Sequence, residues 1–214
     1  LADDTEQVTQ LLDKLRAQGG GVIDLVVDNA GFELCTDLLL ADHLVGSGAA
    51  TCVRFRVKHH PTFVSDALER DVDAHIAELA KGDGAAASVA KRWGERRAKG
   101  EFVCVADTYW AMPYALWDVP ETLYDHLRDS SSLIVVKGDA NYRRALGDRP
   151  WPLDAPFAEV CSYAPAPLLC LRTLKAELGC GMAKAGTDRA ASSDKTWLTD
   201  GRWGVVHFAP AANE

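Results

Sequence analysis

Residues 22–33 of the chain read VIDLVVDNAGFE, and this stretch decides the fold. Its first six residues are apolar except for Asp24, which predicts a strand buried on both faces, as strands of a parallel sheet are. Asp28 and Asn29 follow the strand directly. Because ligands of open parallel sheets bind beyond the carboxyl ends of the strands, these two side chains are candidate site residues.

Helical and strand patterns alternate on both sides of this stretch. Helices are predicted over residues 5–18, 36–45, 85–99 and 121–129 and after Asp66, and further strands over 52–57, 102–105, 133–136, 168–171 and 204–208. Stretches rich in small residues predict flexible loops at 82–88 and 179–193. Strands that alternate with helices favour right-handed crossovers, so we expect a Rossmann-like three-layer α/β/α sandwich with a mainly parallel sheet, formed by residues 1–214 as a single domain.

The composition is that of a globular domain, with 214 residues of which 48% are hydrophobic and 25% charged. A net charge of -8 argues against nucleic acid or an anionic membrane as a partner, since both require a basic surface. No run is apolar enough to cross a bilayer, and the start has no signal-peptide pattern. Six cysteines without a CxxC pair indicate reduced, buried thiols, so we expect a cytoplasmic protein.

Two more polar segments come after predicted strands. Ser65 and Asp66 follow the strand at 52–57, and the string KGDANYR at 137–143 follows the strand at 133–136. Carboxylate and amide oxygens suit a hard divalent cation, and lysine and arginine suit a phosphate. The absence of a His/Cys cluster favours such an ion over structural zinc. These patterns predict an anion- and metal-binding domain without identifying a reaction.

Each of these features also has a purely structural interpretation. The string DNAG at 28–31 is typical of a turn, and Asp66 before a predicted helix is typical of an N-cap. Charged side chains at 137–143, and at Arg172 and Lys175, are compatible with solvated surface positions. His59 and His60, which precede a proline, fit a surface turn better than a pair of metal ligands.

Four strings that occur in order along nearly the whole chain carry a family resemblance. They are VVDNAGFELCTDLLLADHL at 26–44, FVSD at 63–66, KGDANYRRALGDRPW at 137–151 and LRTLKAEL at 171–178. Together they resemble the metal-dependent damage-control phosphatases, and within them the subfamily marked by an RTxK motif. That subfamily is also described as acidic residue methyltransferase or protein-glutamate O-methyltransferase. Four linked motifs are far more specific than any one of them.

The resemblance implies a role for each motif. The metal ligands would be Asp28, Asn29 and Asp66. Glu33 would coordinate the ion or lie next to its ligands, and Asp28 and Asp139 would be catalytic. The implied substrate-binding residues are Asp28, Asn29, Glu33, Asp139, Ala140, Asn141, Tyr142, Arg143, Arg172 and Lys175.

The implied activity is that of a phosphomonoester hydrolase acting on small phosphorylated metabolites such as fructose 1-phosphate and fructose 6-phosphate. The cofactor would be manganese, cobalt, nickel or magnesium, which would polarise a phosphoryl oxygen while Lys175 and Arg143 neutralise the others. Either a metal-bound water or Asp28 itself would attack. Asp139 would orient sugar hydroxyls or carry a proton.

The chain departs from the family pattern in two places. Thr62 stands where the family commonly has an aromatic residue, and His59 and His60 are outside the pattern, so we expect a different pocket wall there. The resemblance also implies a helical region before the first strand, which is missing here. We therefore expect the chain to be the C-terminal part of a longer protein.

Two other functions are compatible with these patterns. One is an S-adenosylmethionine-dependent carboxyl methyltransferase, although the chain has no glycine-rich GxGxG loop followed by an acidic ribose ligand. The other is a metabolite-binding domain without catalytic activity. Assays of each substrate with and without a chelator distinguish the three.

Overall fold

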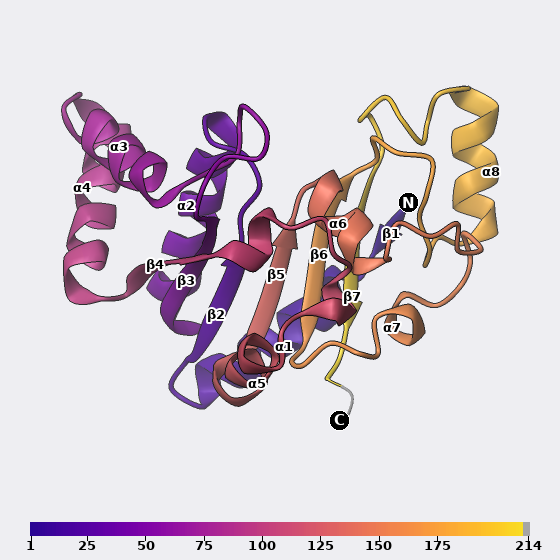
Figure 1. Cartoon of the computed structure of the whole chain (residues 1–214). Helices are drawn as coiled ribbons and strands as arrows, with labels where there is room; N and C mark the ends of the chain where they lie inside the picture. Colours follow the sequence, from indigo (N-terminus) through magenta and orange to yellow (C-terminus); the bar gives the residue numbers. More distant parts are fainter. Residues whose placement is uncertain (212–214) are drawn as a thin grey trace. The chain divides into compact units, whose positions relative to one another are not determined.

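The computed structural model describes residues 1–211 and contains seven strands and eight α-helices within them (Figure 1). The chain divides into two compact units, Leu1–Leu12 with Pro113–Glu214 and Asp13–Met112, and each is described by itself. All the described strand pairs are parallel except the pair β6–β7. The predicted α/β class, a Rossmann-like three-layer fold with a mainly parallel sheet, is therefore confirmed.

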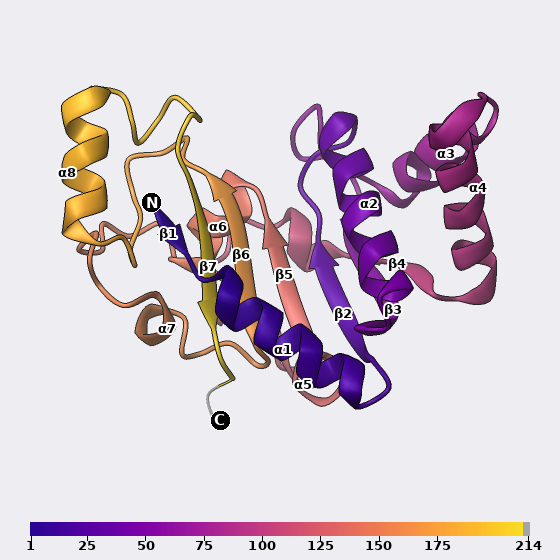
Figure 2. The same cartoon turned by 180° about the vertical axis from the view of Figure 1, so that it is seen from behind.

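The unit Asp13–Met112 contains three parallel strands in the order β2-β3-β4. They are β2 (Gly21–Val26), β3 (Ala50–Lys58) and β4 (Phe102–Asp107), connected by α2 (Phe32–Gly46) and by the pair α3 (Glu69–Ala80) and α4 (Gly84–Lys99). Figure 2 shows α2 in front of β2 and β3. Asp42 of α2 accepts hydrogen bonds from Arg92 and Arg96 of α4, so these helices lie side by side.

Apolar side chains of β2, β3 and α2 form the core of this unit. Ile23, Leu25, Phe55, Leu34 and Leu38 are fully buried. Burying one such side chain stabilises the fold by about 2 kcal/mol. The nearly continuous apolar run of β2 is thus explained by a strand covered on both faces.

A buried ion cluster links β2 to β3. Asp24 is 0% exposed and is paired by the register with Arg54 on the neighbouring strand. Its carboxylate accepts hydrogen bonds from Nε of Arg54, at 2.9 Å, and from Arg56. Two guanidinium groups thereby compensate the one polar residue of the VIDLVV run.

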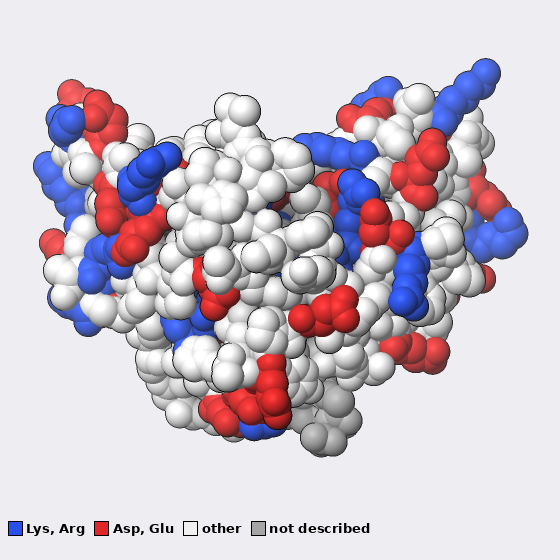
Figure 3. All heavy atoms as spheres, in the orientation of Figure 1, with Lys and Arg blue, Asp and Glu red and all other residues white. Residues whose placement is uncertain are grey.

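The surface of the helix pair α3–α4 carries charges of both signs. Arg97 of α4 forms ion pairs with Glu69, at 2.7 Å, and Asp73, at 3.0 Å, both on α3. In the view of Figure 3, acidic and basic side chains are interspersed over these helices. Exposed pairs of this kind add only ~0.5 kcal/mol each.

The unit Leu1–Leu12 with Pro113–Glu214 contains four strands in the order β1-β7-β6-β5. They are β1 (Ala2–Asp3), β5 (Leu133–Lys137), β6 (Leu168–Thr173) and β7 (Gly204–Ala209), with α5 (Glu121–Ser130), α6 (Asp139–Ala145), α7 (Phe157–Val160) and α8 (Lys184–Ser193). Helix α1 (Thr5–Ala17) begins in this unit and ends in the other. Within residues 1–211 there are also two short 3-10 helices, η1 (Thr108–Ala111) in the unit Asp13–Met112 and η2 (Leu116–Asp118) in this one.

The predictions of flexible loops at 82–88 and 179–193 are partly wrong. Residues 184–193 form α8, and α4 begins at Gly84, inside the loop expected at 82–88. Small residues suggested flexibility, but Thr187 and Ala190 of α8 and Ala87 of α4 are buried. Tertiary packing of a small apolar face, which composition does not reveal, therefore stabilises both segments as helices.

All six cysteines are free thiols. Cys161, Cys170 and Cys180 are buried and the other three are half-buried, so the expectation of buried thiols holds for half of them. No helix within residues 1–211 is both long and apolar enough to span a membrane.

Three stacked rings form a buried cluster between α6, α7 and β7. The His207 ring lies 4.6 Å from that of Phe157, and its Nδ1 is 3.1 Å from the Tyr142 hydroxyl. Burial lowers the pKa of His207 to about 4 and raises that of Tyr142 well above its ordinary value. Both side chains are therefore neutral near pH 7.

Acidification should destabilise the protein through His207. Its pKa is 6.5 when unfolded and about 4 when folded, so between these values the unfolded state binds more protons. The contribution of His207 to the free energy of unfolding is fully present above the unfolded pKa. It is lost as the pH falls through the folded pKa, and the whole loss amounts to ~3 kcal/mol.

The variant His207→Gln keeps a hydrogen-bond acceptor but does not titrate. Its free energy of unfolding in urea should therefore change less between about pH 7 and about pH 5 than that of the parent chain. Carboxylates titrate alike in both proteins and cancel in the comparison. An identical pH dependence in the two proteins would contradict the assignment.

Candidate functional site

The loop after β2 brings together three residues predicted to form the site. Asp28 is 8% exposed, and Asn29 follows it. The Asn29 amide Nδ2 donates to Asp28 Oδ2 and to Glu33 Oε2, both at 3.1 Å. Gly31 immediately precedes α2 and has a φ of 80°, a backbone conformation that glycine adopts easily. The chain therefore turns sharply at Gly31, and Glu33 lies in the first turn of the helix.

The FVSD segment lies against this loop. Backbone hydrogen bonds join Ala30 N to Ser65 O, at 2.7 Å, and Ala67 N to Asp28 O, at 3.0 Å. The Ser65 hydroxyl donates to Asn29 Oδ1 at 2.7 Å, and Asn29 forms an antiparallel bridge with Asp66. Asp28, Asn29, Glu33 and Asp66, which lie on two separate motifs, therefore meet in one place.

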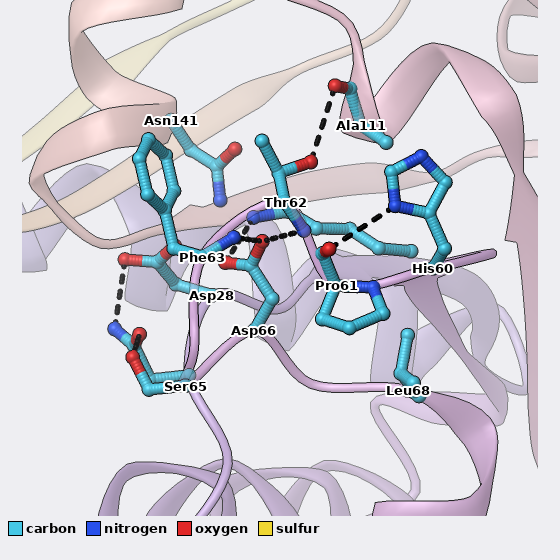
Figure 4. A network of polar contacts seen from close by, with 12 residues as sticks. Asp28, His60, Pro61, Thr62, Phe63, Ser65, Asp66, Leu68, Ala111 and Asn141 are labelled. Carbon is cyan, nitrogen blue, oxygen red and sulfur yellow. Dashed lines mark hydrogen bonds and ion pairs between the residues drawn. The ribbon is translucent and has the colours of Figure 1, made fainter.

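Asp66 is 4% exposed, and both of its oxygens are bound. Oδ2 accepts the backbone N–H groups of Thr62 and Phe63, each at 2.8 Å, as the dashed lines of Figure 4 show. Oδ1 accepts from the ammonium of Lys58. Helix α3 begins only at Glu69 and is preceded by Leu68, so the alternative role of Asp66 as an N-cap is wrong.

Sequence reasoning missed Lys58. This lysine is 7% exposed, is the last residue of β3 and forms an ion pair with Asp66. The same rule that selected Asp28, a polar residue at the carboxyl end of an apolar strand, would have found it.

His75 of α3 was also missed. Its Nε2 accepts the Gly31 N–H at 3.0 Å, and its Nδ1 donates to Asp71 O at 2.6 Å. It thus supports the Asn29–Gly31 turn from a helix 44 residues away along the chain. No local pattern in the sequence signals a contact at that separation.

The side chains of this cluster fit a hard divalent cation. Asp28, Asn29 and Asp66 offer carboxylate and amide oxygens, which magnesium and manganese prefer. Within residues 1–211 no three His, Cys, Asp or Glu side chains, the carboxylates of this cluster included, are arranged so that they could hold a metal ion by themselves, and the predicted set combines two carboxylates with the amide of Asn29. With Glu33, the cluster has three carboxylates and one ammonium, which favours one more positive charge.

The other unit holds the KGDANYR and RTLK motifs. Asp139, the first residue of α6, accepts at Oδ1 from Arg172 Nε at 2.7 Å and from the Lys175 backbone N–H at 3.1 Å. Lys175 is exposed, and its ammonium has no partner within the described part of the chain. Its stem lies beside Gly201, where a Cβ would approach Lys175 Cε to 3.5 Å.

The remaining predicted residues of α6 have different surroundings. Asn141 and Tyr142 are buried, and Asn141 Nδ2 donates to Lys137 O at 3.0 Å. Ala140 is exposed, and so is Arg143, which forms a two-point pair with Asp148 at 2.7 and 2.8 Å. Among the predicted substrate-binding residues of these two motifs, Asp139, Arg143 and Lys175 have charged groups that solvent can reach, and Arg143 is already paired with Asp148.

The two departures from the family pattern lie at the surface. His59 and His60 are exposed, and His60 Nδ1 donates to Pro61 O at 3.1 Å, as expected for a surface turn. Thr62 contributes its backbone N–H to Asp66, and its hydroxyl donates to Ala111 O at 3.3 Å. The bond to Asp66 therefore does not depend on the side chain at position 62.

Comparisons with known proteins identify relatives along most of the chain. Residues 1–190 match the damage-control phosphatase ARMT1-like domain. The damage-control phosphatase ARMT1 of Mus musculus is 37% identical over 97% of this chain and 49% of its own length. The proteins of that name from Danio rerio and Homo sapiens are 36% identical over 90% of this chain and 35% identical over 97%. The chain spans about half the length of these relatives.

The Lys58–Asp66 pair gives a test of the cation site. Lys58→Met keeps the aliphatic stem but leaves a buried carboxylate without its cation, which should lower the free energy of unfolding by about 3 kcal/mol in the presence of a chelator. Manganese should then raise the melting temperature of the variant more than that of the parent, because an ion at Asp66 replaces the lost charge.

Lys81→Met is the matched control, since Lys81 forms an exposed pair with Glu78 on α3. It should change neither the stability nor the response to manganese. If Lys58→Met responded to manganese no more than the parent does, Lys58 and the ion would not share Asp66.

Proposed function

The chain belongs to the damage-control phosphatase ARMT1-like family, and on that premise we propose that it is a metal-dependent phosphatase of small phosphorylated metabolites. The observation that carries the proposal is the joining of the Asp28–Asn29 loop to the Ser65–Asp66 loop. It gathers buried carboxylate oxygens from two motifs that are far apart in the sequence. Burying several carboxylates together costs desolvation free energy unless cations compensate their charge.

We assign the cation-binding role to Asp28, Asn29 and Asp66. When bound, the ion, which we propose to be manganese, cobalt, nickel or magnesium, supplies positive charge that stabilises the phosphoryl oxygens during transfer. Glu33 orients Asn29 through the hydrogen bond at 3.1 Å. The backbone N–H groups of Thr62 and Phe63 hold the carboxylate of Asp66 in one orientation.

The KGDANYR and RTLK motifs are proposed to bind the substrate. The Lys175 ammonium acts as a point charge on phosphate, and its exposure is compatible with that role. Asp139 orients a hydroxyl of the substrate or moves a proton. Attack on phosphorus comes from Asp28 or from a water molecule, which this assignment leaves as alternatives.

Fructose 1-phosphate and fructose 6-phosphate are the substrates that we propose to test first. Both are small phosphorylated metabolites, the substrate class that the family resemblance implies. We also propose a cytoplasmic location, because six free thiols suit a reducing compartment.

The proposal predicts that chelation abolishes hydrolysis of fructose 1-phosphate and that manganese restores it. Asp28→Asn and Asp66→Asn keep side-chain size but remove a ligand charge, and each should lower kcat/KM at least about a hundredfold, or roughly 3 kcal/mol. Steady-state kinetics at saturating manganese measures this loss.

Two further variants make the test specific. Lys175→Met should lower turnover while titration calorimetry still detects bound manganese, since the lysine is assigned to the substrate. His59→Ala, at an exposed turn, should behave like the parent. Full turnover after exhaustive chelation, or in either aspartate variant, would exclude the proposed metal site.

A further inference from the structure

Arg172 of the RTLK motif is almost completely enclosed by protein. Its side chain is 1% exposed, and each of its three nitrogens donates a hydrogen bond. Nε donates to Asp139 Oδ1 at 2.7 Å, Nη1 to Leu178 O at 2.8 Å and Nη2 to Ala176 O at 3.2 Å. A guanidinium in this position has almost no surface to offer a substrate.

An aromatic stack fixes the guanidinium from a further direction. The Arg172 guanidinium carbon lies 4.4 Å from the centre of the Tyr142 ring. The Tyr142 hydroxyl is in turn 3.1 Å from His207 Nδ1, and the His207 ring stacks on that of Phe157. The plane of the guanidinium is therefore set by buried rings, and its hydrogen-bond donors have fixed directions.

The hydrogen bonds of Arg172 connect two separate segments of the chain. Asp139 is the first residue of α6, whereas Ala176 and Leu178 follow Lys175 after β6. The Lys175 backbone N–H also donates to Asp139 Oδ1 at 3.1 Å. Asp139 Oδ1 thus accepts hydrogen bonds from both the Arg172 side chain and the Lys175 backbone. The same guanidinium also donates to the carbonyls of Ala176 and Leu178, just beyond Lys175.

We propose that Arg172 is a positioning residue. It fixes the carboxylate of Asp139 and the backbone that carries Lys175, and it affects a phosphorylated substrate only through these two residues. The kinetic part of this inference rests on the proposed phosphatase function, whereas the positioning itself does not. Only arginine can serve here, because its planar fork reaches a carboxylate and two carbonyls at once, which a single ammonium cannot do in the same directions.

Amide hydrogen exchange tests the positioning without any substrate. In Arg172→Lys, exchange at the Lys175 amide should become at least about tenfold faster, because its acceptor Asp139 is no longer held. Amides in the middle of β6 should exchange as in the parent. Arg128→Lys, an exposed arginine of α5 in the same unit, is the matched control and should change neither. Unchanged exchange at Lys175 in Arg172→Lys would overturn the proposal.

A second variant covers the case in which Arg172→Lys does not fold. Asp139→Ala removes the shared acceptor from a side chain that is 15% exposed, and Arg172 keeps its hydrogen bonds to the carbonyls of Ala176 and Leu178. Faster exchange at the Lys175 amide is again expected by about tenfold. Exchange as slow as in the parent would show that Lys175 is held by other contacts and would contradict the proposal.

Kinetics then distinguishes positioning from direct contact with the substrate. With fructose 1-phosphate and manganese, Arg172→Lys and Asp139→Asn should each lower kcat about tenfold or more. The loss in the double variant should be smaller than the product of the two single losses, because part of the effect of Arg172 passes through Asp139. Losses that multiply would assign Arg172 to the substrate and overturn the inference. If the parent hydrolyses no phosphate ester, the proposed function fails, and the exchange measurement still decides the positioning.

Discussion

A carboxylate in the segment that follows a parallel strand needs a cation and N–H donors around it when it is shielded from water, and each unit of this protein contains one such carboxylate. In one unit Asp66 receives Lys58 and the N–H groups of Thr62 and Phe63. In the other, Asp139 receives Arg172 and the Lys175 N–H. Lys58 is 8 residues from Asp66 along the chain and Arg172 is 33 residues from Asp139, and in both cases the contact that compensates the charge also shapes a loop.

The parts of the fold that the sequence predicted are those decided by local pattern. The VIDLVV run predicted a buried strand, and a turn at DNAG, given as the structural alternative to a site, followed from the preference of asparagine and glycine for turn geometry. The leucines of α2 and the strand at 133–136 were found in the same way. The family resemblance based on four strings is confirmed by the match over residues 1–190.

The parts that were missed depend on contacts made after folding. Residues 184–193 lack a strong apolar face, yet they form α8 around the buried Thr187 and Ala190. His75 reaches Gly31 across 44 residues, and no periodicity encodes that contact. Arg172 is an instructive intermediate case: its motif was recognised, but only burial at 1% distinguishes an arginine that organises a site from one that meets a substrate.

The central claim is that Asp28, Asn29 and Asp66 together hold a divalent cation. Anomalous diffraction from crystals soaked in manganese tests it most directly, because the signal identifies the ion and the map identifies its ligands. The account predicts one strong peak bonded to oxygens of these three residues. A strong peak held by other side chains, with none at the junction of the two loops, would contradict it.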